Sequence, residues 1–218
     1  MLFATPTRYG AGLTIWGDYY DLRHAHDTIS HFFNHSPMEY GLKEYTLSLS
    51  YDIRHAYQRD RQIKKFGMDE LDTVEYLGVN VLWPFFLTQV ALVRQQAAYV
   101  PHTEREQAGL YLLENCARAA LLAYDKVVGQ ELFLWLKHPH SFPDDYLTEY
   151  FNHVTRLFAT EGKAGKTRFK RLPRLLRTLH PISKEYTAFK AKLEVTAKEK
   201  GCSPHELSDW GDWPDFKW

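Results

Sequence analysis

The sequence is poor in cysteine and has no long hydrophobic run. Only Cys116 and Cys202 occur in 218 residues, too few for a disulfide framework or a cysteine-based zinc site. The most apolar window, residues 79–93, is interrupted by asparagine, proline and glutamine, so it is too short and too polar to span a bilayer. Residues 1–6 lack the basic start and apolar stretch of a signal peptide. We therefore expect a reduced, cytoplasmic protein without a membrane segment.

Recognisable nucleotide-binding, hydrolase and metal-binding motifs are missing as well. The chain has no phosphate-binding glycine loop, no Gly-x-Ser-x-Gly nucleophile elbow, and no Cys-x-x-Cys or His-Glu-x-x-His pattern. Lys plus Arg and Asp plus Glu number 27 each, so the net charge favours neither a general nucleic-acid binder nor an acidic shield. We expect no cofactor and no bound metal.

Aromatic residues, in contrast, are abundant. The 13 Phe, 14 Tyr and 6 Trp, within a hydrophobic content of 44%, can form one well-packed core. Alternation of polar and apolar residues predicts strands in the first hundred residues, and helical spacing follows two of them. The predicted strands are 3–7, 13–17, 45–50 and 74–83, and the predicted helices begin at Asp21 and at Asp52, the second ending at Gly67.

The second half of the chain has helical spacing throughout. Thr103 and Glu106 form the capping box of a long helix that is expected to break near Gly129. Glycine, proline and capping residues mark the ends of the other helices. These are predicted to begin near Ser141, to span residues 172–179, to run from Ser183 to Gly201, and to add a short turn at residues 203–206.

No proline- or serine-rich linker divides the chain, so the sequence predicts one compact α+β domain over residues 1–218. Residues 1–100 are expected to form a small β-sheet with packed helices. Residues 101–208 are expected to be all-helical, and residues 209–218 to be an aromatic, acidic tail.

Two short segments nearly repeat each other. Residues 20–26 read Tyr-Asp-Leu-Arg-His-Ala-His, and residues 51–57 read Tyr-Asp-Ile-Arg-His-Ala-Tyr. In each copy the aspartate is expected to cap a helix that follows a strand, the aliphatic residues to face the core, and arginine and histidine to point outward.

The doubled segment also carries side chains that suit phosphodiester chemistry. If the two turns met in space, His24 and His55 would form a general acid–base pair. Arg23 and Arg54 would then hold the phosphate. This arrangement would make a metal-independent phosphodiesterase or ribonuclease, whereas two separate helix caps would carry no chemistry.

Histidines also recur on one side of the first predicted helix. His24, Asp27, His31 and His35 fall on one narrow helical face, and two imidazoles with a carboxylate can bind a divalent metal. Because this face lies opposite the apolar one, we favour a solvated polar surface over a metal site.

Residues 163–184 form the sharpest charge asymmetry, since they include many basic side chains and no acidic one. A helix of this kind attracts a polyanion such as RNA or DNA, with salt-dependent affinity. The alternative is a solvated basic surface. The candidate polyanion contacts are Lys166, Arg168, Lys170, Arg171, Arg174 and Arg177.

In residues 209–218 an aspartate precedes an aromatic residue three times. Gly211 and Pro214 exclude a regular helix there. The aromatic side chains are expected to dock as anchors, on this protein's own surface in preference to a partner, and the aspartates could then neutralise the basic segment of the same chain. The candidate anchors are Trp210, Trp213, Phe216 and Trp218.

The segments Gly-Asp-Tyr-Tyr-Asp-Leu at 17–22, Tyr-Asp-Ile-Arg-His-Ala-Tyr-Gln at 51–58 and Leu-Trp-Pro at 82–84 resemble a group of small bacterial proteins known only as a domain of unknown function. The resemblance implies a bacterial cytosolic protein and carries no activity. We therefore predict a non-enzymatic interaction protein that binds a partner protein or a polyanion, with the phosphodiesterase as the alternative. A homodimer stays open, because many predicted helices have apolar faces.

Overall fold

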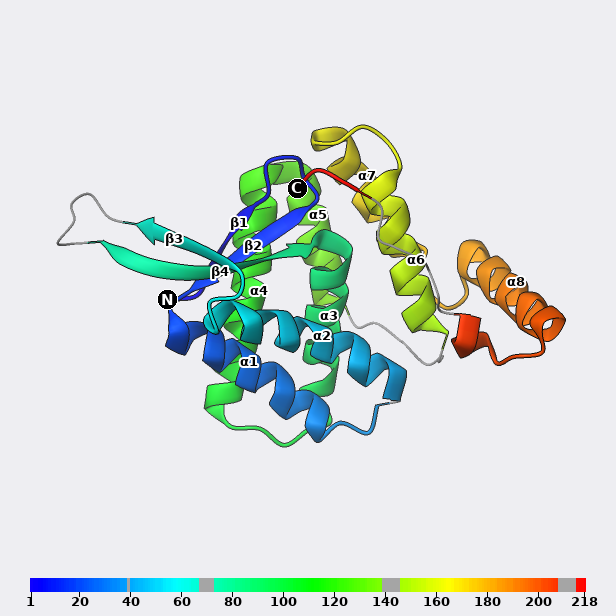
Figure 1. Cartoon of the computed structure of the whole chain (residues 1–218), viewed down its shortest axis with the longest axis horizontal. Coiled ribbons are helices and arrows are strands. Elements are labelled where there is room, and N and C mark those ends of the chain that lie inside the picture. The colour runs from blue at the N-terminus through cyan, green and yellow to red at the C-terminus, as the bar shows by residue number, and fades with distance from the viewer. Residues whose placement is uncertain (39, 67–72, 139–145, 208–214) are drawn as a thin grey trace.

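The computed structural model of the chain describes residues 1–38, 40–66, 73–138, 146–207 and 215–218. An antiparallel sheet near the N-terminus is followed by helices (Figure 1), so the predicted α+β class is confirmed. Among these residues, no helix combines the length and the apolarity needed to cross a bilayer.

The sheet contains β1 (Phe3–Pro6), β2 (Gly12–Gly17), β3 (Gln62–Phe66) and β4 (Val74–Leu82). Its order is β1-β2-β4-β3, and every neighbouring pair is antiparallel. A Cβ atom added at Gly12 would come 1.9 Å from a carbonyl oxygen of β4, so the central strands approach more closely there than any other residue allows. The β3–β4 hairpin projects away from the body (Figure 1).

Two helices, α1 (Tyr19–Asn34) and α2 (Tyr40–Tyr57), run antiparallel beside each other (Figure 1). The N-cap of α1 is Asp18, and Asp21 completes a capping box with it. The prediction that Asp21 itself caps the helix is therefore wrong by one turn. It takes the third helical position, where an acidic side chain reaches back to the N-cap backbone.

The predicted strand at residues 45–50 is wrong, because these residues lie inside α2. Asp52 consequently sits within a helix and caps nothing. After α2, Arg59 turns the chain with a φ of 71°, and β3 replaces the helix that was predicted to continue to Gly67. Helical spacing over the longer window prevails over a six-residue alternation. The buried side chains that show this spacing are Leu42, Tyr45, Leu49, Ile53 and Ala56.

Behind the sheet lie α3 (Trp83–Gln96), α4 (Glu104–Tyr124) and α5 (Lys126–Lys137). The first of these begins directly where β4 ends, with a proline in its first turn. The predicted capping box at the start of α4 is confirmed. The break between α4 and α5 falls at Asp125, whose side chain caps α5. Gly129 lies inside α5, not at the break.

Glu114 links these three helices at one point. It is buried on α4, and its carboxylate accepts hydrogen bonds from Arg94 of α3 and Lys137 of α5. The two cations are about two-thirds buried. A buried carboxylate is tolerated when cations neutralise both of its oxygens, as they do here.

The C-terminal helices are α6 (Leu147–Thr160), α7 (Lys166–Arg177) and α8 (Lys184–Lys200). The predicted ends of α8 are confirmed. The Ser183 hydroxyl accepts from the backbone of the first turn, and Gly201 ends the helix in the left-handed conformation.

Three smaller predictions concern the same region. The basic helix expected over residues 172–179 begins earlier, at Lys166. The predicted turn after Ser203 is the short helix η1 (Pro204–Leu207). The predicted helix start near Ser141 lies outside the described residues.

Candidate functional site

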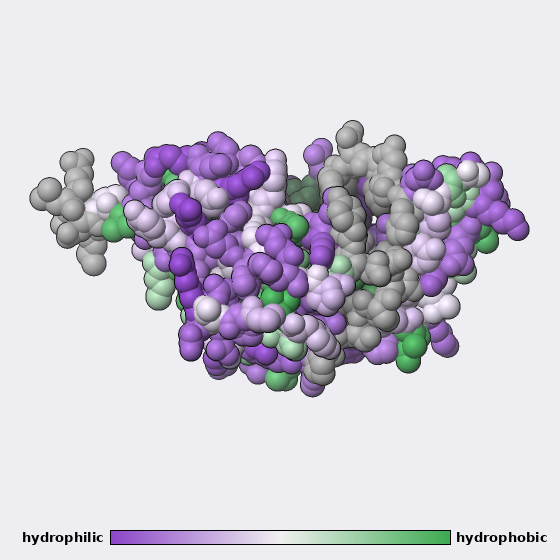
Figure 2. All heavy atoms as spheres, turned by 90° about the horizontal axis from the view of Figure 1, so that it is seen from below, coloured by the Kyte–Doolittle hydropathy of each residue, from purple (hydrophilic) through white to green (hydrophobic). Residues whose placement is uncertain are grey.

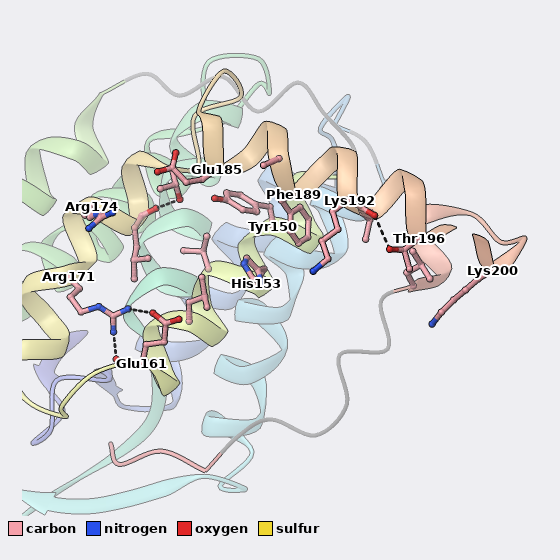
Figure 3. Close-up of a pocket in the computed structure, with 17 residues that line it drawn as sticks. Tyr150, His153, Glu161, Arg171, Arg174, Glu185, Phe189, Lys192, Thr196 and Lys200 are labelled. Atoms are coloured by element: carbon pink, nitrogen blue, oxygen red, sulfur yellow. Dashed lines mark hydrogen bonds and ion pairs between the residues drawn. The ribbon is translucent and has the colours of Figure 1, made fainter. Parts of the chain in front are cut away.

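A cavity of about 900 Å³ lies between α6, α7, α8 and η1 (Figure 3). The α6 side chains that line it share one face of that helix, because they recur at three- and four-residue intervals. They are Tyr150, His153, Val154, Leu157 and Glu161. This face of α6 forms one wall of the cavity, and α7, α8 and η1 supply the other lining residues.

Aromatic rings join α6 to α8 near the first turns of α8. The Tyr150 ring centroid lies 5.2 Å from that of Tyr186 and 5.1 Å from that of Phe189. Farther along α8 the side chains facing the cavity are smaller, as at Leu193 and Thr196. The cavity that the described residues line extends along α8 beyond these rings, as far as Lys200 (Figure 3).

His153 belongs to the aromatic wall of the cavity. Its ring stacks on Phe189 at 5.1 Å and 29° and on Tyr150 at 5.9 Å and 28°. Burial lowers the pKa of His153, although Glu161 opposes this effect. Burial likewise raises the pKa of Tyr150. At neutral pH both rings are therefore uncharged surfaces on which an apolar ligand group can lie.

Several cationic side chains lie at the rim of the cavity. Arg171 is paired with Glu161, with 2.7 Å between Nη2 and Oε2. Arg174, Lys192 and Lys200 are exposed and have no ion pair with any described residue. Four cations and two carboxylates, Glu161 and Glu185, line the cavity, so its rim attracts negative charge.

One of the predicted polyanion contacts, Arg168, is buried against the last residues of the chain. Arg168 is only 4% exposed, and its Nη1 donates to the carbonyl oxygen of Lys217 at 2.9 Å. Burial lowers its pKa. The prediction of Arg168 as a surface contact is wrong, because this position faces the body and not solvent.

The remaining basic candidates divide into two groups. Lys166, Lys170 and Arg174 are exposed at intervals of four residues, so they share one face of α7. Arg171 and Arg177 each form an ion pair with a glutamate from a neighbouring segment. The basic surface available to a polyanion is therefore narrower than the sequence predicts.

The two catalytic histidine candidates have separate partners. His24 Nε2 bonds to the Arg105 carbonyl oxygen at 3.0 Å, and His55 Nδ1 bonds to Asp60 at 2.9 Å. At 100° per residue, His24 lies about 140° around α1 from Tyr19, which contacts α2. No contact in the described structure joins the two imidazoles, so they do not form an acid–base pair.

The doubled segments nevertheless meet, through other side chains. The Tyr57 ring lies 5.4 Å from Tyr19 and 5.7 Å from His26. Arg23 donates to the Tyr19 hydroxyl at 3.0 Å, and Arg54 lies over the Tyr51 ring at 5.2 Å. Tyr57 thus joins the two helices through Tyr19 and His26, whereas each arginine contacts a tyrosine of its own helix.

The histidine stripe of α1 binds the segment that leads into α4. His31 Nε2 bonds to the Pro101 carbonyl oxygen at 2.9 Å, alongside the His24 bond to the first turn of α4. Its partner His35 bonds back to the His31 carbonyl oxygen. This face is therefore partly an interhelical contact, and among the described residues no cluster of potential ligands is arranged for a metal.

The described end of the tail docks on the body. The Tyr9 amide donates to the Trp218 carbonyl oxygen at 2.9 Å, and Lys217 lies over the Tyr9 ring at 5.8 Å. The Phe216 and Trp218 rings are 5.0 Å apart. Trp210 and Trp213, the other anchor candidates, lie outside the described residues.

Sequence reasoning missed the cavity, although each of its walls had a signal. The apolar spacing of α6 and the basic residues of α7 were visible. Local sequence patterns do not predict how far α6 lies from α8, because that separation depends on contacts between side chains that are far apart in the sequence.

The chain belongs to the family described as Domain of unknown function (DUF6904), which matches residues 2–218. No curated protein and no solved structure matches it.

Proposed function

We propose that this DUF6904 chain is a non-enzymatic interaction protein, whose α6–α7–α8 cavity binds an acidic, amphipathic segment of a partner protein. The observation that carries the proposal is the combination, in one cavity, of an apolar, aromatic floor with a rim where Arg174, Lys192 and Lys200 have no ion pair with a described residue. A cytoplasmic location belongs to the same proposal, because both cysteines are free thiols.

The shape of the cavity supports a helical occupant. Its lining residues on α8 extend from Glu185 to Lys200, which corresponds to roughly 22 Å of helix. A groove of this length between two helices suits the helix-in-groove mode, in which an amphipathic helix buries its apolar face. Carboxylates beside that face would then meet Arg174, Lys192 and Lys200.

Nucleic acid fits this cavity less well. Of the predicted phosphate contacts, Arg168 is buried and two others are already ion-paired. The phosphodiesterase alternative has no observation in its favour, because His24 and His55 are held by different partners.

Charge reversal at the rim tests the proposal. The probe is a fluorescent amphipathic peptide with acidic residues flanking an apolar face, and a lysine version of the same peptide is the reference. We expect the acidic peptide alone to bind. Replacing Arg174 and Lys192 together with glutamate should weaken it about tenfold or more, as expected when two charge-assisted contacts are lost.

Two further variants complete the experiment. Lys198→Glu changes the same charge on the same helix but lies outside the cavity lining, so it should leave binding unchanged. Thr196→Trp should fill the cavity and abolish binding without removing a cation. Equal binding of both peptides, or loss of binding in Lys198→Glu, would contradict the proposal.

A further inference from the structure

The doubled segment produces a surface that the cavity proposal does not use. Each copy places a tyrosine and, three residues later, an arginine on the solvent side of its helix. Tyr20 is 79% exposed and Tyr51 is 51% exposed. Arg23 and Arg54, which follow them, are exposed as well. Tyrosine and arginine are among the residue types enriched at the energetic centres of interaction sites, so a surface that gathers two of each is a candidate site.

The register of α1 against α2 sets the order of these side chains. Ser30 bonds to Ser50, and His26 contacts Tyr57. In this antiparallel register, Arg23 and Arg54 lie within roughly one helical turn of each other along the axes, whereas Tyr20 and Tyr51 lie roughly 13 Å apart in that direction. The resulting order is tyrosine, arginine, arginine, tyrosine, diagonally across the helix pair.

The aromatic part of this surface is held in place without a ligand. Tyr19 packs edge-on against Tyr20 at 5.3 Å and against Tyr57 at 5.4 Å. Arg23 donates to the Tyr19 hydroxyl, and Arg54 lies over Tyr51. Side chains that are already ordered lose less conformational entropy when they bind.

The two arginines also keep most of their charge available. Arg54 has no ion pair with a described residue, and Arg23 has only a long one, 3.8 Å to Asp27. The neighbouring carboxylate of Asp52 is satisfied by Arg61 at 3.0 Å. Exposed ion pairs as long as the first one contribute little and are easily exchanged.

We propose that this surface binds single-stranded nucleic acid, with bases stacked on Tyr20 and Tyr51 and phosphates bound by Arg23 and Arg54. Aromatic platforms beside cations are the general basis of such binding. The repeated tyrosine–arginine pair favours this ligand, because a nucleic-acid strand likewise repeats an aromatic base and an anionic phosphate. Stacking on tyrosine discriminates little between bases, so the binding is sequence-tolerant.

Fluorescence anisotropy of labelled oligo(dT) and oligo(U) strands, each of about 12 nucleotides, tests this inference with the full chain. Binding should weaken as salt rises, because phosphate contacts release counterions. The double variant Tyr20→Ala with Tyr51→Ala should raise Kd about tenfold or more, the loss expected for two stacked bases. The double variant Arg23→Met with Arg54→Met should weaken binding and flatten its salt dependence.

Matched controls are available on α4 and just before it. Tyr99 and Tyr111 are exposed to a similar degree, and their double alanine variant should bind as the unchanged protein does. The charge-reversed cavity variant should also bind normally, which separates this site from the proposed peptide site. Absence of binding, equal affinity for duplex DNA, or no effect of the tyrosine pair would overturn the inference.

Discussion

The helix pairs α1–α2 and α6–α8 differ in how closely their helices approach. The first pair is in contact at both ends, through Tyr19 with Tyr57 and through the bond of 2.9 Å between the Ser30 and Ser50 hydroxyls. In the second pair, the ring contacts between the described residues lie near the first turns of α8. In the first pair the small side chains of Ser30 and Ser50 meet beyond the Tyr19–Tyr57 contact and let the two backbones come together, whereas the contacts described for the second pair are between large rings.

This difference determines what each pair presents to a ligand. The closed seam of α1–α2 leaves only its outer surface, where tyrosines and arginines gather. The open seam of α6–α8 leaves a cavity with cations around it. Elsewhere, the face in Figure 2 is mostly hydrophilic, with hydrophobic residues as separate spots and not as a continuous patch, as is usual for a protein surface.

Identical truncations in the two pairs should have unequal effects. Leu49 of α2 is 1% exposed in the core, and Leu193 of α8 is 9% exposed beside the cavity. Leu49→Ala should lower the free energy of unfolding by about 2–5 kcal/mol. Leu193→Ala should lower it less, by about 1–2 kcal/mol, because this side chain borders the cavity and is packed on fewer sides. Urea denaturation measures both, and equal losses would mean that α8 is packed as tightly as α2.

A larger side chain should also affect the two helix pairs unequally, and it should destabilise the closely packed α1–α2 pair more than the α6–α8 pair. Ser50→Leu should destabilise the protein by about 1–3 kcal/mol, because the closed seam has no room for a larger side chain. Thr196→Leu should be nearly neutral, since it extends into the cavity. Thermal denaturation of the two variants provides the comparison, and a large loss in Thr196→Leu would show that the open seam is not empty.

The smallest expected effect is a pH dependence from the open seam. Burial lowers the pKa of His153 in the folded chain, so as pH falls the unfolded chain takes up this proton first, near pH 6.5. Stability from His153 is therefore present above about pH 6.5 and is lost as pH falls below it. His153→Phe should flatten the fall in urea midpoint between about pH 7.5 and 5.5. A fall as steep as that of the unchanged protein would assign the effect to other histidines.

Features with local signals were predicted correctly from the sequence. The β1–β2 hairpin, β4, the capping box at Thr103 and both ends of α8 depend on residues close together in the chain. The part of α2 predicted as a strand was misread, because a short alternation concealed the helical period around Tyr45.

Features that join distant residues could not be predicted in this way. Glu114 meets a cation 20 residues before it and another 23 residues after it, and nothing in its own helix indicates either partner. The basic segment was recognised, yet the burial of Arg168 depends on the tail that covers it. The doubled segment is evident in the sequence, but which of its side chains meet depends on the antiparallel register of α1 and α2.

The peptide groups around Tyr9 have a mechanical consequence. The Tyr9 amide donates to the Trp218 carbonyl oxygen, and the Tyr9 carbonyl oxygen accepts from the Gly165 amide at 2.7 Å. Peptide units are stiff planes, so a displacement of the last residues is transmitted through one residue to the start of α7. Because Arg174 of α7 lines the cavity, a pull on the end of the chain would be felt at the proposed binding site.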